Sequence, residues 1–265
     1  MATNYSVQPN DKITFKVRYE DDDVVVINKP SKIVTTPGLG HEDDSLLNGL
    51  FAVYGNKLQK MGRARDFGML HRLDRDTSGL VMIALKPDAY DKLREVFEQR
   101  EVAKYYWAVT KNRPKGDTGV IRKPIIEYEG KVKGDNRNKK LARISAAGKP
   151  AVTAYRVVQS TDRATLLECR AVTGRLHQLR VHLDSINCPI LGDEFYGPAN
   201  LRQVATRLAL HAHRITFPQP TTGKKVDVHS PWPADLKGLL KTMGLNRPDL
   251  EPPKPKAEAP QDDVD

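Results

Sequence analysis

The sequence has little cysteine and no long hydrophobic run, and each shortage excludes a class of protein. Only two of the 265 residues are cysteines, Cys169 and Cys188, and both stand beside apolar residues. We expect two buried thiols in a reducing compartment rather than a disulfide. The longest apolar runs, such as 24–27 and 80–85, are much too short to span a bilayer. The N-terminal residues contain no secretory signal, so we expect a soluble, cytoplasmic protein without a membrane partner.

Glycine-rich phosphate loops and metal-ligand clusters are missing as well. The chain contains neither a Walker-type nor a dinucleotide-binding glycine pattern. His211 and His213 share one face of a predicted strand, but no carboxylate or cysteine has matching ligand spacing. Asp74 and Asp76 lie in one loop, whereas a glycosidase places its two carboxylates on separate elements across the sugar. We therefore expect no metal, no cofactor, and one functional carboxylate in this loop.

Positive charge is what the sequence has in excess. Lys and Arg total 43 against 33 Asp and Glu, a net charge of +10. The last fifteen residues hold five acids and two lysines, a net −3, so the rest of the chain carries +13, the difference between +10 and −3. Charge of that sign favours polyanionic partners. The basic segment 131–149 is one candidate for phosphate contacts, and a solvated loop is the equal alternative for it.

Hydrophobic patterning predicts an α+β fold. Helices are expected over 45–55 with Ser45 as N-cap, over 88–100 with Asp88 as N-cap, and over 175–186 and 234–244. Val53 is expected on the apolar face of the first helix. Strands are expected near 13–17, 24–30, 79–85, 103–110, 151–158, 165–171, 208–217 and 224–231. Strands outnumber helices and do not alternate with them, so the central sheet should be mixed or mostly antiparallel.

The remaining segments set the domain organisation. Residues 57–66 read as a basic connector, and residues 129–149 as an exposed loop or ribbon. We expect a polar lead-in over 1–20, one folded domain over 21–245, and a disordered, proline-rich acidic tail over 246–265.

Two arginines, a histidine and two aspartates are crowded into residues 71–76, directly before a strand-like apolar run. The letters DTSG favour a tight bend, so Asp74 lies in the loop that leads into this strand. The neighbouring cations Arg72 and Arg75 favour an ionised carboxylate. A fixed carboxylate can act as nucleophile or general base. A surface cluster of salt bridges is the alternative, and we expect Arg75 and Asp76 to form no more than a loop ion pair.

Two other segments carry candidate residues. Arg180 lies within or beside the apolar stripe of its predicted helix, so it requires a carboxylate partner unless it reaches water. Asp74 is one candidate partner, but spacing alone does not select it. In KYYWAV, Lys104, Tyr106 and Ala108 share one face of a predicted strand. A tyrosine in a cleft can stack on a base or assist proton transfer, although core packing is the ordinary role.

These motifs resemble those of the RluA-type pseudouridine synthases. The resemblance runs from about Val24 to Trp232, in the family's order, and HRLD-x-x-TSG followed by TGR-x-HQLR-x-H is highly specific. The blocks that carry it are INKPSKIVTTPG, HRLDRDTSGLVM, KYYWAV, TGRLHQLRVHLDSINCPILGDEFYG and LALHAHRITF. The family isomerises uridine to pseudouridine in structured RNA without cofactor or metal. Its fold, by resemblance, is a mixed, mostly antiparallel sheet flanked by helices and loops, with an RNA-binding cleft.

The resemblance also implies roles for five residues. Asp74 corresponds to the catalytic aspartate, which acts as nucleophile or as base. Arg180 corresponds to the basic residue that pairs with this aspartate. Tyr106 corresponds to the tyrosine that stacks on uracil and helps to remove its C5 proton. Arg72 corresponds to the residue that fills the gap left by the flipped base, and Leu210 to an apolar residue near the base.

The expected function follows from these implied roles. The protein should isomerise uridine in ribosomal RNA, with transfer RNA as the second candidate substrate. A catalytically silent RNA-binding or ribosome-assembly factor is the alternative from another class. Only about twenty residues precede the first matching block, too few for the N-terminal S4 domain that many members carry. DNA is not an expected partner, and a monomer is the default expectation.

Overall fold

The computed structural model describes residues 5–132 and 135–248. Within these residues a nine-stranded sheet has the order β1-β2-β3-β10-β4-β9-β8-β5, with β11 paired to β10, and β6 and β7 form a separate two-stranded ribbon. Among the strand pairs described, β3 with β10 is parallel and the rest are antiparallel. The predicted α+β fold with a mixed, mostly antiparallel sheet is therefore confirmed. None of the helices in these residues has the length and apolarity of a membrane span.

The strands are β1 (Lys16–Glu20), β2 (Val24–Lys29), β3 (Ser78–Ala84), β4 (Ala103–Thr110), β5 (Thr118–Arg122), β6 (Ile125–Val132), β7 (Asp135–Ile144), β8 (Val152–Ser160), β9 (Thr165–Ala171), β10 (Leu210–Pro218) and β11 (Lys225–His229). The helices are α1 (Leu46–Met61), α2 (Pro87–Glu98), α3 (Gln178–Asp184) and α4 (Lys237–Thr242), with short 3₁₀ helices at Arg63–Gly68, Ala199–Leu201 and Ala234–Leu236.

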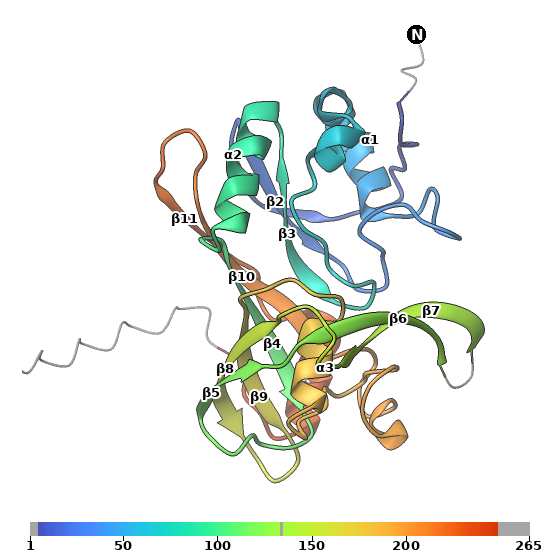
Figure 1. Cartoon of the computed structure of the whole chain (residues 1–265), viewed down its shortest axis with the longest axis vertical. Coiled ribbons are helices and arrows are strands. Elements are labelled where there is room, and N and C mark those ends of the chain that lie inside the picture. The colour runs from blue at the N-terminus through green and yellow to red at the C-terminus, as the bar shows by residue number, and fades with distance from the viewer. Residues whose placement is uncertain (1–4, 133–134, 249–265) are drawn as a thin grey trace, which may run out of the picture.

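Strands β2 and β3 are buried on both faces. Alternate residues face two different apolar clusters: Val25 and Val81 pack with the apolar side of α1, while Val24 and Met82 pack with residues of α2, β10 and β11. A strand covered on both sides reads as a continuous apolar run, which is how both of these appear in the sequence. In Figure 1, α1 and α2 lie beside the N-terminal strands, whereas α3 lies beside β4, β8 and β9.

Several predicted boundaries are wrong, for local reasons. The first strand is Lys16–Glu20 rather than 13–17, and it pairs with β2. Ser45 does cap α1, in a capping box with Asn48, but the helix continues to Met61 and takes in half of the predicted connector. Val53 is 64% exposed, because the side of α1 that carries it faces outward rather than toward the core.

Helices α2 and α3 also begin differently from the prediction. Helix α2 starts at Pro87 with Lys86 in the N-cap position and no side-chain cap, so Asp88 lies in the first turn. Proline fits there because the first helical N–H has no partner in any case. Helix α3 starts only at Gln178, because His177 adopts a left-handed conformation with φ 51°.

The predicted loop or ribbon over 129–149 is in large part the β6–β7 hairpin, which projects from the body as an arm (Figure 1). Its base is anchored where the Ala142 N–H donates to the Tyr196 hydroxyl at 2.9 Å. Residues 249–265 of the predicted tail lie outside the described part of the chain.

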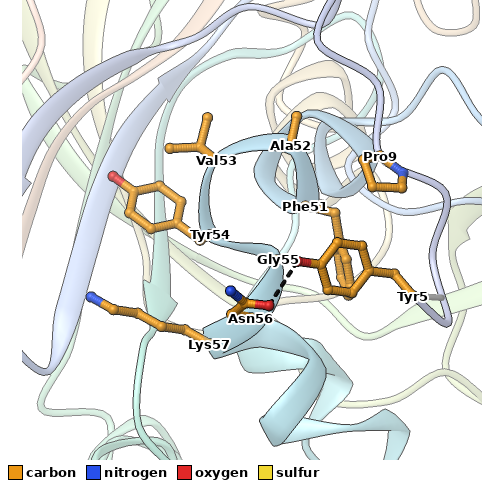
Figure 2. A pocket seen from close by; sticks show the side chains of 9 residues that line it. All are labelled: Tyr5, Pro9, Phe51, Ala52, Val53, Tyr54, Gly55, Asn56 and Lys57. Carbon is orange, nitrogen blue, oxygen red and sulfur yellow. Dashed lines mark hydrogen bonds between the residues drawn. The ribbon is translucent and has the colours of Figure 1, made fainter. Parts of the chain in front are cut away.

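The N-terminal segment packs on α1 and forms an open cavity of about 560 Å³ with it. Figure 2 shows the Tyr5 hydroxyl directed at Asn56, to which it donates a 2.8 Å hydrogen bond. The Tyr5 ring meets Phe51 edge to face at 5.6 Å, and a Cβ at Gly55 would come within 2.8 Å of it. This part of the predicted lead-in is therefore packed against the domain.

Candidate active site

The loop that carries Asp74 is held from both sides by its backbone. The Thr35 hydroxyl donates to the Leu73 carbonyl at 2.7 Å and accepts from the Leu73 N–H at 3.1 Å. On the other side, the Thr77 N–H donates to the Asp74 carbonyl at 3.2 Å, which closes the predicted bend. Leu73 itself is buried, whereas the Asp74 side chain stays 25% exposed. The carboxylate is thus fixed in place and still open to a ligand.

A buried lysine supports the same loop from below. Lys29 is fully buried, and its ammonium donates to the carbonyls of Pro30 at 2.9 Å, Ile33 at 2.7 Å and Arg75 at 3.2 Å. Burial lowers the pKa of Lys29 to about 7, against the opposing charges of Asp74 and Asp76. Its three hydrogen bonds tie the segment after β2 to the Asp74 loop.

Arg180 lies between two carboxylates. Its Nε and Nη2 donate to the two oxygens of Asp193 at 2.8 and 2.7 Å, and its Nη1 donates to Asp74 Oδ2 at 3.4 Å. Asp74 and Arg180 are 106 residues apart in the chain. Burial alone would lower the pKa of Arg180, but the hydrogen bonds and charge of Asp193, with a smaller contribution from Asp74, raise this pKa above its usual value. Arg180 is therefore a fixed cation directed at Asp74.

Tyr106 approaches the site from the central sheet. It lies on β4 opposite Cys169 of β9 and Ala212 of β10, and it is 7% exposed. Burial, together with the charge of Asp74, raises the pKa of the Tyr106 phenol well above its usual value. Its hydroxyl has no hydrogen-bond partner among residues 5–132 and 135–248. A neutral phenol close to Asp74 is thus available to a ligand.

Leu210 is a buried residue of the sheet, whereas Arg72, Arg75 and Asp76 lie at the surface of the Asp74 loop. Leu210 is 3% exposed on β10, in the same apolar cluster as Tyr106. Arg72 is exposed and forms no ion pair within the described residues. Arg75 and Asp76 make the expected loop ion pair, with 3.2 Å between Nε and Oδ1.

Comparison with known proteins decides the family. The family model described as "RNA pseudouridylate synthase" matches residues 23–185, more than half of the chain. The chain belongs to this family. The synthase is 35% identical over 93% of its length to the Bacillus subtilis protein named "Uncharacterized RNA pseudouridine synthase YlyB", of which it covers 84%. It is also 35% identical to the Vibrio vulnificus "Ribosomal large subunit pseudouridine synthase D", over 87% of this chain and 71% of that protein.

A solved structure agrees with this assignment. The structure entitled "Human RNA Pseudouridylate Synthase Domain Containing 4" superposes with a TM-score of 0.68 at 27% sequence identity, over 88% of the synthase and 95% of that chain. As a member of this family the synthase is an RNA-modifying isomerase.

Besides Lys29, two residues of the site in the synthase were missed by sequence reasoning. Asp193, which is 1% exposed, takes both of the shortest bonds of Arg180 and also accepts the backbone N–H groups of Phe195 and Tyr196 at 2.9 and 3.1 Å. His177 places Nε2 3.9 Å from Asp74 Oδ2, while its Nδ1 lies 2.7 Å from the Tyr196 hydroxyl. Burial lowers the pKa of His177 to about 4, so it is neutral at pH 7.

A cavity of about 290 Å³ opens beside Arg180. Lys32, Arg75 and Arg207 line it together with Arg180, opposed by the carboxylates of Asp76 and Glu194. Four cations and two carboxylates therefore line a cavity that shares Arg180 with the site in the synthase. No group of three or more His, Cys, Asp or Glu side chains in the described parts of the chain is placed to hold a metal ion.

Proposed function

We propose that this protein is a pseudouridine synthase of ribosomal RNA in which Asp74 is the catalytic residue. The observation that carries the proposal is the 3.4 Å contact between Asp74 and Arg180, two residues 106 positions apart in the chain. Family membership supports the reaction, and relatives named for the large ribosomal subunit support the substrate. A ribosomal substrate in turn favours a site of action in the cytoplasm.

The reaction needs a uracil that can rotate in the site and a carboxylate that is held in a fixed position. The bond between ribose C1′ and uracil N1 breaks, the base rotates, and a bond between C1′ and C5 forms, while the proton on C5 leaves and N1 gains one. No atom is added, so the isomerisation requires no co-reactant. Asp74 acts on the flipped nucleotide as nucleophile or as base, and Arg180 holds its carboxylate in one orientation.

The other predicted residues then have complementary tasks. Tyr106 lies beside Asp74, where its ring can stack on uracil and its hydroxyl can relay the C5 proton. Arg72 is exposed and can fill the gap that the flipped base leaves in the RNA, which offsets part of the few kcal/mol that flipping costs. Leu210 supplies apolar packing near the base.

The remaining affinity comes from phosphate contacts. The β6–β7 arm carries exposed Lys131, Lys140 and Arg143, in keeping with the basic segment singled out in the sequence. Cations of this kind bind RNA backbone without reading its sequence. The choice of uridine is therefore assigned to loops around the cleft rather than to this arm.

Pseudouridine mapping of total RNA from cells with and without the gene tests the proposal. One or more uridines of large-subunit ribosomal RNA should lose their modification, and re-expression of the wild type should restore it. Asp74→Asn, which removes the charge and keeps the shape, should bind RNA without restoring the modification. Loss of pseudouridine confined to transfer RNA would show that transfer RNA, not ribosomal RNA, is the substrate. Full restoration of the modification by Asp74→Asn would overturn the mechanism.

A further inference from the structure

Lys104 is a partly buried cation to which the mechanism above gives no task. It lies two residues before Tyr106 on β4 and shares a strand face with it. No hydrogen-bond acceptor or carboxylate contacts its ammonium among residues 5–132 and 135–248. By contrast, Lys29 and Arg180 near the site each donate three hydrogen bonds. A cation without an anion is an uncompensated cost to the free protein.

The groups around the Lys104 ammonium are all neutral. The Phe97 ring lies 5.4 Å from Nζ, a cation–π contact that offsets only part of the lost hydration. Burial lowers the pKa of Lys104 to about 8 with no contribution from a carboxylate. His71 is uncharged, since burial and then the charge of Lys104 lower its pKa to about 3. Nothing in the described chain therefore supplies the missing negative charge.

The backbone at Gly174 leaves open space next to the ammonium. A Cβ added at Gly174 would meet only one atom within 4 Å, the Lys104 Nζ at 3.8 Å. Gly174 stands in the loop that leads to α3 and Arg180, while His71 immediately precedes Arg72 in the Asp74 loop. Lys104 is thus flanked by the two loops that hold the candidate catalytic pair, and the glycine leaves its ammonium open.

We propose that Lys104 binds a backbone phosphate of the RNA strand next to the target uridine. This inference rests on the proposed function, because the anion that pairs with Lys104 would be a phosphate of the RNA substrate. Tyr106 and Lys104 then act from one strand face, the tyrosine on the base and the lysine on the adjacent backbone. Binding of the phosphate replaces the hydration that Lys104 has lost, so its cost in the free protein is recovered when RNA binds.

The test measures RNA affinity against salt for Lys104→Met, with Lys241→Met on the exposed side of α4 as the matched control. The probe is a transcript of large-subunit ribosomal RNA. We expect Lys104→Met to weaken binding about tenfold at low salt. The slope of log Kd against log salt should fall by about 0.7 to 1, as for one lost phosphate contact. Lys241→Met should keep the wild-type slope, and Lys104→Arg should keep most of it.

The melting temperature separates this role from a purely structural one. Lys104→Met removes an uncompensated charge and should melt at or above the wild-type temperature, although RNA binding is weaker. If Lys104→Met left the salt slope unchanged, or lowered the melting temperature with unchanged RNA affinity, the proposal would be overturned. Lys104 would then serve only to pack against Phe97. If the wild type bound RNA but formed no pseudouridine, the proposed function would fail instead, and the salt slope would still report on Lys104.

Discussion

The two carboxylates that share Arg180 should differ in how strongly the same substitution affects stability and activity. Asp193 is 1% exposed and makes two short bonds to Arg180, which is itself 3% exposed. Removing one member of such a buried pair costs about 3–5 kcal/mol, because the remaining charge stays buried. Asp74 is 25% exposed, at 3.4 Å, and its loss leaves Arg180 with Asp193. Because Arg180 keeps its stronger partner, removal of the Asp74 contact should cost only about 1 kcal/mol at most.

Asp193→Asn should therefore lower the melting temperature by about 10 °C, taking about 2–4 °C per kcal/mol for a domain of this size. Asp74→Asn should lower it by about 4 °C at most, yet abolish pseudouridine formation. The assay is thermal unfolding of both variants, with pseudouridine formation on a ribosomal RNA transcript measured well below the lower melting point. Equal melting temperatures for the two variants would refute the division of Arg180 into a structural and a reactive side.

Three more predictions follow from the same geometry. The free energy of unfolding should fall by about 2 kcal/mol between pH 7 and pH 5 through His71 alone. Folding lowers the pKa of His71 from 6.5 to about 3, so the unfolded chain takes up the proton first as the pH falls. Urea unfolding at both pH values should show a smaller difference for His71→Gln than for the wild type. Tyr106→Phe should keep the melting temperature and RNA affinity but slow the reaction about 100-fold in single-turnover assays, because only a proton-transferring hydroxyl is lost. Gly79→Ala should cost about 3 kcal/mol or more in the free energy of unfolding, since at φ 119° its Cβ would lie 2.3 Å from the Ala212 carbonyl oxygen; a soluble variant with wild-type stability would contradict this.

Most strands of the sheet could be predicted, because each shows a local sequence pattern, but β5 at the end of the strand order was not. Strands β2, β3, β4 and β9 combine apolar or aromatic runs with turn residues at their ends, and burial on both faces does not obscure that signal. Helix starts were harder, because they depend on single dihedral angles. The left-handed conformation of His177 shortens α3 by about one turn. The segment TGRLHQLR gives no sign of it, and the contact of His177 with Tyr196 is visible only in the structure.

The site was predictable to the extent that one residue demanded another. Arg180 within an apolar stripe requires a carboxylate, but only the family resemblance selected Asp74, which lies 106 residues away in the chain. The pattern did not indicate that Arg180 would contact two carboxylates. Asp193 makes the shorter hydrogen bonds to Arg180, but in the sequence it is an ordinary acid in a glycine-containing loop. Lys29 was hidden for the opposite reason: lysine at a strand end normally reaches water, and only the fold reveals three carbonyls converging on its ammonium. Sequence reasoning thus found the residues to which the proposed function assigns the reaction, whereas Asp193 and Lys29, which position them, emerge only when distant loops are brought together.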